Sequence, residues 1–519
     1  MMHLTGSWTA AGPPEPRIGS GLGYPALRAL GECPIEQTCS LRQEQWIMGR
    51  SPSSSSSSRE LFPRGTRPPL PLCRWSGVLP VLPVLPVLPV LPVLSVLSVL
   101  SVLLGACDPY ARWPDPAEVF PWSYEPLAGL EPYEEVRFET DTWEPLVDAY
   151  ETAQYVIKSL EHRKDAPIEE LQHFGLSRPP PIVAGHPLLS FVGDLMVMDD
   201  FAPSYAAGVA PLLDGGLRIG NLETPVSPIH PTDPSELVVE YGLYAFNAPL
   251  SILDALPLDV LQLNNNHALD LGDEGLEQTY KSVSGRGYVP IGFGGNRVQA
   301  ALGELEVALL SYTWGINGAP ESRYDLAVVP FGHLEAGLDL DRIRDEIAEA
   351  RADGSSHVVL LLHWGFEYEY WPDPHFMRLA RRMVRYGADV VVGQGPHVAQ
   401  PAEVCAVNQP LAIPGIGQCS VRTDDGEQRN AAVLYSLGNF GTDLDGLPLE
   451  VGIVGSVSLD PEGGVSGVGF EPIARVATDE GVVLAPLVDL ATDPVDGEAY
   501  AEEALRLDRL LGTSWRRTR

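Results

Sequence analysis

The second part of the chain alternates between short aliphatic runs and stretches of helical periodicity, and this alternation constrains the fold more than any other feature. Helical spacing of apolar residues is clearest at 340–350 and at 375–386. Strands separated by helices form βαβ units, in which a largely parallel sheet is covered on both faces. The predicted strands are 188–192, 217–220, 260–263, 307–311, 358–362, 390–392 and 433–437.

Residues 451–484 follow a different pattern, in which polar and apolar residues alternate between glycine-containing turns. Alternation with a period of two is typical of antiparallel strands. The combined prediction is an α/β sandwich with a β-rich end. This main domain is expected to span 181–485, and a helical tail is expected at 486–519.

The composition fits a large and strongly acidic protein. The chain has 519 residues, of which 45% are hydrophobic, so it can bury a sizeable core. Its 34 Lys and Arg residues oppose 69 Asp and Glu residues, and the formal net charge is −35. Because nucleic-acid affinity depends on neutralising phosphates, we expect no nucleic-acid partner.

Residues 1–107 are predicted to be an unstructured leader that ends in a signal peptide. Val-Leu-Pro repeats give way to Val-Leu-Ser repeats, which run into Leu104-Gly105-Ala106-Cys107. Proline breaks helices, so only 93–106 is expected to form the apolar core of a secretory signal. The last four residues resemble a bacterial lipobox, which predicts an exported protein of the cell envelope, anchored in a membrane by a lipid on Cys107. The alternative is an ordinary cleavage site beside an incidental cysteine.

Two further features concern the exported part. Residues 108–180 are predicted to be a tether followed by a helix that Asp141 caps, so the main domain would carry an N-terminal helical extension. Cys405 and Cys419 lie in a stretch rich in proline and glycine, which predicts a loop. In an exported protein this pair is expected to form a disulfide, and two free thiols are the alternative.

Polar residues that can bind metal follow five of the predicted strands. In sheets of this kind the functional residues lie just beyond the carboxyl ends of the strands. One such residue is usually a cap or a satisfied hydrogen-bonding group, but two carboxylates and three imidazoles at one edge match the mixed ligand shell of Mn, Fe or Zn. The residues are Asp194, Glu223, Asn266 with His267, His363 and His397.

These residues lie in motifs that together resemble the CapA family of capsule synthesis proteins, also described as poly-gamma-glutamate synthesis proteins. The resemblance extends over 184–480. It implies a four-layer α/β/β/α sandwich with a two-metal site, because the family is related to the calcineurin-like metallophosphoesterases. The motifs are Gly-Asp at 193–194, Asn-Leu-Glu at 221–223, Asn-Asn-His at 265–267, Tyr-Thr-Trp-Gly-Ile-Asn at 312–317, His-Trp-Gly-x-Glu-Tyr at 363–368, Gly-x-x-Pro-His at 393–397 and Tyr-Ser-Leu-Gly-Asn-Phe at 435–440.

The resemblance also implies roles for the individual residues. Asp194 would bind the first divalent ion, Mn, Fe or Zn, and Glu223 would bridge to a second one. Asn266 would be an amide ligand and His267 the neighbouring acid or base, so these two form the predicted catalytic pair. His363 and His397 would be the remaining metal ligands.

The sequence departs from the related patterns at two positions. Metallophosphoesterases usually have Asp-x-His at the first motif, whereas this chain has Met196 two residues after Asp194. The family normally has a further His just before Pro-His, and here Gln394 and Gly395 occupy those positions. With fewer imidazoles, one metal is expected to be held weakly.

A substrate-binding region is predicted beside His363. Tyr368 belongs to a strip of aromatic and acidic residues, 367–371, which could line a groove for a polymer or could be loop packing. Arg378, Arg381 and Arg382 share one helical face with Arg385, and in so acidic a chain they could bind an anionic capsule polymer. The alternative for the arginines is an ordinary solvated helix face.

Three functions remain open at this point. The first is a metal-dependent hydrolase of the cell envelope that acts on a phosphoester. The second is a non-catalytic component of the capsule synthesis machinery that binds or guides a polyanion such as poly-gamma-glutamate. The third is a secreted acidic protein that binds sugars or peptides through the aromatic strip.

Overall fold

The computed structural model describes the main domain and the C-terminal helices of this chain. The predicted leader, Cys107 and nearly all of the tether and helix expected at 108–180 lie outside the described residues. The described ranges are 179–196, 201–237, 245–317, 322–329, 340–409, 418–423, 426–444, 446–492 and 497–512.

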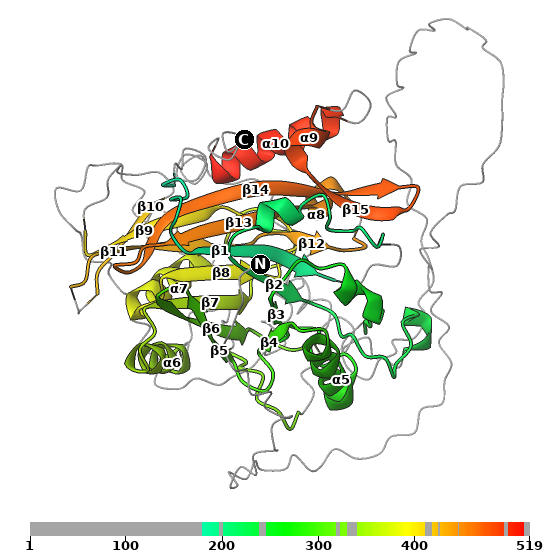
Figure 1. Ribbon diagram of the computed structural model, residues 1–519, viewed down its shortest axis with the longest axis horizontal. Helices are drawn as coiled ribbons and strands as arrows, with labels where there is room; N and C mark the ends of the chain where they lie inside the picture. Colours follow the sequence, from blue (N-terminus) through cyan, green and yellow to red (C-terminus); the bar gives the residue numbers. More distant parts are fainter. Residues whose placement is uncertain are drawn as a thin grey trace, which may run out of the picture. The chain divides into compact units, whose positions relative to one another are not determined.

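In this part of the chain the strands form two sheets (Figure 1). Both sheets are mixed, with parallel and antiparallel neighbours in each. The first sheet runs β15 (Gly481–Pro486), β14 (Val465–Thr478), β13 (Val451–Leu459), β1 (Leu188–Leu195), β2 (Leu217–Leu222), β3 (Val260–Gln262) and β4 (Val289–Ile291), and β12 (Asn439–Gly441) also pairs with β1. The second sheet runs β10 (Gln418–Val421), β9 (Ala402–Val407), β11 (Arg429–Leu434), β8 (Val390–Gln394), β7 (His357–His363), β6 (Leu305–Thr313) and β5 (Arg297–Leu302).

The strands that lead to the predicted ligands are parallel. In the first sheet β1, β2, β3 and β4 are parallel neighbours, and in the second β6, β7 and β8 are. The strands β13, β14 and β15 are antiparallel, as the alternating pattern of 451–484 predicted. Parallel neighbours end at the same edge of a sheet, so this topology brings the residues after β1, β2, β7 and β8 to the region where the site lies.

Helices cover the sheets. The helix α5 (Gly272–Gly285) contacts β4, whereas α6 (Asp341–Ala352) contacts β7 and α7 (Pro374–Tyr386) contacts β8. The short helices α8 (Leu447–Glu450) and α9 (Leu487–Leu490) precede α10 (Gly497–Leu511), and α9 contacts β14 (Figure 1). Three 3-10 helices complete the described elements, at Ala210–Leu213, Pro234–Glu236 and Leu250–Asp254. The predicted four-layer α/β/β/α sandwich is therefore confirmed.

The central strands are buried on both faces. Phe191 of β1 packs into the large core that also contains α6 and α7, whereas Val192 packs into a second core with Leu276 of α5. A strand covered on both sides has no solvent-facing positions, so it appears in the sequence as a continuous apolar run. This is why these strands could be located from the sequence.

Cys405 and Cys419 are joined by a disulfide, as predicted, with 4.3 Å between their Cα atoms. The expected loop is wrong, because the two cysteines lie opposite each other on the parallel strands β9 and β10. The prolines and glycines that suggested a loop lie between these two strands in the sequence. Because both strands are short, this composition dominates the local sequence pattern.

We expect the double substitution Cys405→Ser, Cys419→Ser to lower the free energy of unfolding by about 3 kcal/mol, because the bond closes a loop with a sequence separation of 14 residues. Urea unfolding of the oxidised wild type and of the variant measures the difference. Wild type treated with a reductant should match the variant. Equal stability of all three would contradict the prediction.

No helix among the described residues is long and apolar enough to cross a membrane.

Candidate metal centre

The ends of four strands bring two carboxylates and two imidazoles together between the sheets. Asp194 lies near the end of β1 and Glu223 directly follows β2, while His363 is the last residue of β7 and His397 lies three residues beyond β8. Donor atoms of Asp194, Glu223 and His363 all lie within 4.8 Å of one another. Four of the predicted metal ligands are thus neighbours in the folded chain.

The contacts in this cluster join each imidazole to a carboxylate. His363 Nε2 is 3.5 Å from Glu223 Oε1. His397 lies between both acids, with Nδ1 3.4 Å from Asp194 Oδ2 and Nε2 3.7 Å from Glu223 Oε1. His397 is therefore linked to both carboxylates of the group that Asp194, Glu223 and His363 form.

Glu223 provides the strongest test of whether the cluster suits a metal. Its exposed fraction is 0%, and neither carboxylate oxygen has a hydrogen-bond partner among the described residues. Burial raises the pKa of Glu223 well above its ordinary value; the charges of Asp194 and Glu367 add to this, and that of His397 opposes it. Buried carboxylates are normally paired or bound to a cation, so the site fits a divalent ion.

Of the remaining three groups, His363 and Asp194 have pKa values that suit metal binding, whereas the raised pKa of His397 means that a bound ion would displace a proton from its ring. Burial lowers the pKa of His363 to about 3, so its imidazole is neutral and able to bind metal. Burial also acts to lower the pKa of His397, but the charges of Glu223 and Asp194 raise it to about 10. Burial acts to raise the pKa of Asp194, and contacts with His397 outweigh it and lower that pKa.

Amide groups that were not predicted as site residues fix the orientation of these ligands. Asn221 Nδ2 donates to Asp194 Oδ1 at 2.7 Å, and the backbone NH of Gly395 donates to Asp194 Oδ2 at 2.9 Å. His397 Nδ1 is 3.1 Å from Asn439 Oδ1, an arrangement that holds the proton on Nδ1 and directs Nε2 towards Glu223. Asn221 and Asn439 both lie in the family motifs of the sequence, so these motifs could have identified them as site residues.

His267 belongs to a separate hydrogen-bonded group. Its Nδ1 is 2.8 Å from Asp270 Oδ2, and the NH of Phe246 donates to the same oxygen at 2.9 Å. The Phe246 ring lies 4.7 Å from the His267 ring, measured between centroids. Asp270 was missed in the sequence, although its spacing of three residues from His267 was visible.

Asn266 lies at the edge of the same region. Its Oδ1 is buried without a hydrogen-bond partner among the described residues, and its Nδ2 is 3.4 Å from Asn317 Oδ1. Asn317 Nδ2 is in turn 3.4 Å from His267 Nε2. A free, buried amide oxygen suits the predicted ligand role, and the two amides together could bind substrate oxygens.

The predicted arginine face is not a single open surface. Only 6% of Arg378 and 8% of Arg381 is exposed, and Arg381 Nε is 3.2 Å from Glu403 Oε2 on β9. Arg382 is half-buried and donates to the Tyr386 hydroxyl. The helical spacing identified the shared face correctly but not that β9 covers part of it. Polymer binding at these arginines stays a prediction.

Tyr368 lies directly beside the cluster. Its ring centroid is 6.1 Å from that of His397, and its backbone NH donates to the Pro396 carbonyl at 2.8 Å. The predicted groove residue therefore lies at the rim of this cluster. His375 is buried at the start of α7, where its NH donates to the capping residue Asp373.

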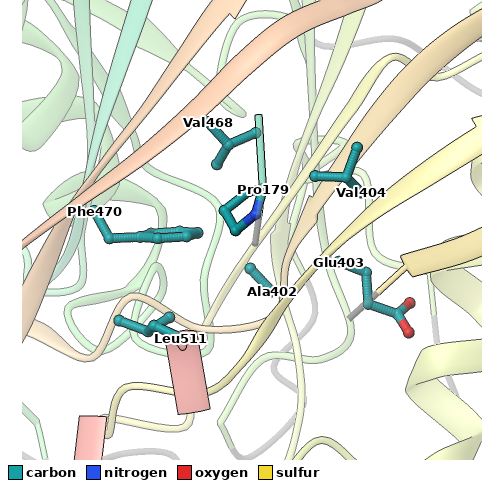
Figure 2. Close-up of a pocket in the computed structure, with 7 residues that line it drawn as sticks. All are labelled: Pro179, Ala402, Glu403, Val404, Val468, Phe470 and Leu511. Carbon is teal, nitrogen blue, oxygen red and sulfur yellow. The ribbon is translucent and has the colours of Figure 1, made fainter. Parts of the chain in front are cut away.

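A small, mostly apolar pocket lies elsewhere, between β9, β14 and the end of α10 (Figure 2). Phe470, Val404 and Leu511 are among its lining residues. The Glu403 carboxylate points away from the apolar lining, and it accepts hydrogen bonds from Arg381 and from the Tyr435 hydroxyl. The one polar side chain among the lining residues is therefore already hydrogen-bonded outside the pocket.

We expect Arg381→Met to destabilise the fold by about 3–5 kcal/mol, because it leaves Glu403 as a buried charge without its guanidinium. Chemical unfolding measures this change. As a control, Arg385→Met on the same helix removes a half-buried charge and should cost less than about 1 kcal/mol. If both substitutions lower the free energy of unfolding by the same small amount, the Arg381–Glu403 pair does not stabilise the fold.

Comparison with known proteins identifies a matching family and relatives. Residues 188–443 match the family described as bacterial capsule synthesis protein PGA_cap. The PGA biosynthesis protein CapA of Bacillus subtilis (strain 168) is 26% identical over 268 residues, which are 48% of this chain and 62% of that protein. The capsule biosynthesis protein CapA of Bacillus anthracis is 28% identical over 291 residues, which are 51% of this chain and 67% of that protein.

Among solved structures, the calcineurin-like phosphoesterase YfkN from Bacillus subtilis is similar, with 11% identity and a TM-score of 0.31. The alignment covers 64% of this chain and 98% of that one.

Proposed function

We propose that this chain, whose residues 188–443 match the family described as bacterial capsule synthesis protein PGA_cap, is a metal-dependent hydrolase of the phosphoesterase type that serves capsule or poly-gamma-glutamate synthesis. The observation that carries the proposal is the buried Glu223 carboxylate, which has no hydrogen-bond partner among the described residues and lies within 4.8 Å of donor atoms of Asp194 and His363.

The donor set fits a divalent ion. Asp194, Glu223, His363 and His397 would hold it, with Asn266 as a further candidate ligand. A bound ion of this kind would supply Lewis-acid activation of a substrate oxygen and of a water molecule. The mixture of carboxylate and imidazole donors suits Mn, Fe or Zn.

His267 is placed to move a proton. Asp270 accepts from Nδ1, so the tautomer is fixed and Nε2 is left to donate a proton to a leaving group or to take one from a nucleophile. Asn266 and Asn317 can orient the substrate through their amides, since Asn317 Nδ2 lies 3.4 Å from His267 Nε2. Burial of the cluster keeps bulk water away from these groups.

The absence of two imidazoles favours one alternative. Met196 takes the place of the usual histidine of the first motif, and Gln394 and Gly395 stand just before Pro-His, where a further histidine is usual. The same centre could therefore serve as a non-catalytic site that binds a polyanion during capsule assembly. Its partners would be an anionic capsule polymer and the capsule synthesis machinery, whereas the hydrolase would act on a phosphoester.

One set of preparations distinguishes the two functions. Metal content and hydrolysis of p-nitrophenyl phosphate and bis-p-nitrophenyl phosphate are measured on the full chain. Metal-dependent turnover that His267→Gln abolishes supports the hydrolase. Bound metal together with polymer binding, but without turnover of either ester, supports the alternative.

We also propose that the protein is exported and anchored in a bacterial membrane through a lipid on Cys107; the sequence of 93–107 supports this. Cys107→Ala is expected to move the protein from the membrane fraction to the soluble fraction of lysed cells, as measured by immunoblotting. An unchanged membrane fraction would contradict the lipid anchor.

A further inference from the structure

We propose that Asn265 is a positioning residue of the metal centre, which orients the Asp194 carboxylate through Asn221 and ties the turn that carries His267 to the end of β2. The inference rests on the proposed metal centre and extends it from the ligands to the side chain that holds them. Asn265 follows β3, and only 1% of it is exposed.

The side chain of Asn265 uses both ends of its amide. Its Nδ2 donates to Asn221 Oδ1 at 3.1 Å and to the Leu222 carbonyl at 2.8 Å. Its Oδ1 accepts from the backbone NH of His267 at 3.1 Å. A primary amide has two N–H donors and one carbonyl acceptor, so both donors and the acceptor of Asn265 have partners. Rotating the amide by 180° would lose all three bonds, and its orientation is therefore fixed.

The bond to Asn221 decides which end of the Asn221 amide faces the cluster. Because Asn221 Oδ1 accepts from Asn265, its Nδ2 points the other way and donates to Asp194 Oδ1 at 2.7 Å. The exposed fraction of both Asn221 and Asp194 is 0%, so water does not supply a substitute donor. Without Asn265, the Asn221 amide is free to turn its oxygen towards the carboxylate, which would repel it.

The remaining two bonds join two segments that carry site residues. The bond to the His267 NH closes the turn after β3, because an asparagine side chain readily accepts from the backbone two residues further on. The Leu222 carbonyl belongs to the last residue of β2 and immediately precedes Glu223. One buried side chain thus sets the turn of the proposed acid or base against the strand that leads to Glu223.

Two substitutions remove the bonds to β2 and keep the turn. Aspartate at 265 has the same shape but no N–H, so it would place an oxygen against Asn221 Oδ1 and the Leu222 carbonyl. Serine at 265 can still accept from the His267 NH, but it has no amide to reach β2. Hydrogen-bond partners of metal ligands change metal affinity by about 10–100-fold, so both substitutions should weaken metal binding.

The test compares full-length wild type, Asn265→Asp, Asn265→Ser and the control Asn408→Asp. Asn408 follows β9 and has similar contacts, since its Nδ2 donates to the Glu427 carbonyl at 2.8 Å and its Oδ1 accepts from the Thr423 NH at 2.9 Å. Each protein is stripped with a chelator and titrated with Mn²⁺ by calorimetry, and its absorption spectrum is recorded with Co²⁺. We expect both Asn265 variants to bind Mn²⁺ at least about tenfold more weakly and to change the Co²⁺ bands, with the control unchanged.

A double-mutant cycle shows whether Asn265 acts through Asn221. Asn221→Ala removes the donor to Asp194 and should itself weaken Mn²⁺ binding. In that background Asn265 has lost its main link to the carboxylate, so Asn265→Ser should weaken Mn²⁺ binding by a smaller factor than it does in wild type. Thermal unfolding of the chelated samples records any loss of stability, which the control should share without losing affinity for Mn²⁺.

Three results would overturn the inference alone. The first is Mn²⁺ affinity of both Asn265 variants equal to that of wild type. The second is an equal loss of affinity in Asn408→Asp, which would make the effect one of general stability. The third is a cycle in which Asn265→Ser weakens binding by the same factor with and without Asn221. Wild type that binds neither Mn²⁺ nor Co²⁺ would instead refute the proposed metal centre, and the inference with it.

Discussion

Glu223→Gln is expected to reduce metal binding by the full chain to background, while the protein without metal becomes more stable than wild type without metal. The carboxylate is fully buried and faces the other ligands, so its loss removes the shared donor of the site. The pKa of Glu223 is raised in the fold, which means that the folded state disfavours the charged form. Above the ordinary pKa of a carboxyl group, ionisation therefore favours unfolding.

The gain in stability at neutral pH should be about 1–3 kcal/mol, because the uncharged amide avoids the cost of burying a carboxylate charge. Metal analysis and thermal unfolding of chelated samples measure the two effects. Glu349→Gln, an exposed position on α6, should change neither. Metal binding retained by Glu223→Gln, or lower stability of the metal-free variant, would contradict the assignment of Glu223.

His267→Gln is expected to lower kcat for phosphoester hydrolysis by about 10²–10⁴-fold while metal content stays unchanged. His267 pairs with Asp270, and among the described contacts it forms no ion pair with Asp194 or Glu223. Its loss should therefore affect proton transfer rather than the ligand shell. Steady-state kinetics and metal analysis on the same samples separate the two.

Asp270→Asn serves as the companion variant. It keeps the shape of the side chain but changes the partner of His267 Nδ1, so kcat should fall by less than in His267→Gln. A variant His267→Gln that loses its metal would make His267 a ligand instead. A His267→Gln variant that keeps full activity would show that His267 is not the acid or base of the reaction.

Most of the central fold could be predicted from the sequence, because its strands are buried on both faces. Runs such as 358–362 contain only apolar residues, which is typical of a strand buried on both faces, and β7 forms there. The short edge strands β4, β5 and β10 were not predicted. They are partly exposed or only a few residues long, and β10 follows a connection rich in proline and glycine, so local composition conceals them.

The positions of the candidate metal ligands could be predicted because each lies at or just beyond the end of a recognisable strand. Asp194, Glu223, His363 and His397 meet as expected, since parallel strands place their carboxyl ends together. The motifs and the spacing could have drawn attention to the supporting residues Asn221, Asn439 and Asp270, but their roles depend on which neighbour each side chain reaches. The same holds for the arginines of α7. Helical periodicity predicts that they share one face of the helix, but only the folded structure shows that Arg381 forms an ion pair with Glu403.

The central claim is that the buried cluster binds a divalent metal, and metal content tests it most directly. The full chain is exposed to Mn²⁺, Fe²⁺ and Zn²⁺ in turn, freed of excess ion, and analysed beside Asp194→Asn and Glu223→Gln. We expect at least one tightly held ion per wild-type chain and none in either variant. Wild type that holds none of the three ions would contradict metal binding by this cluster.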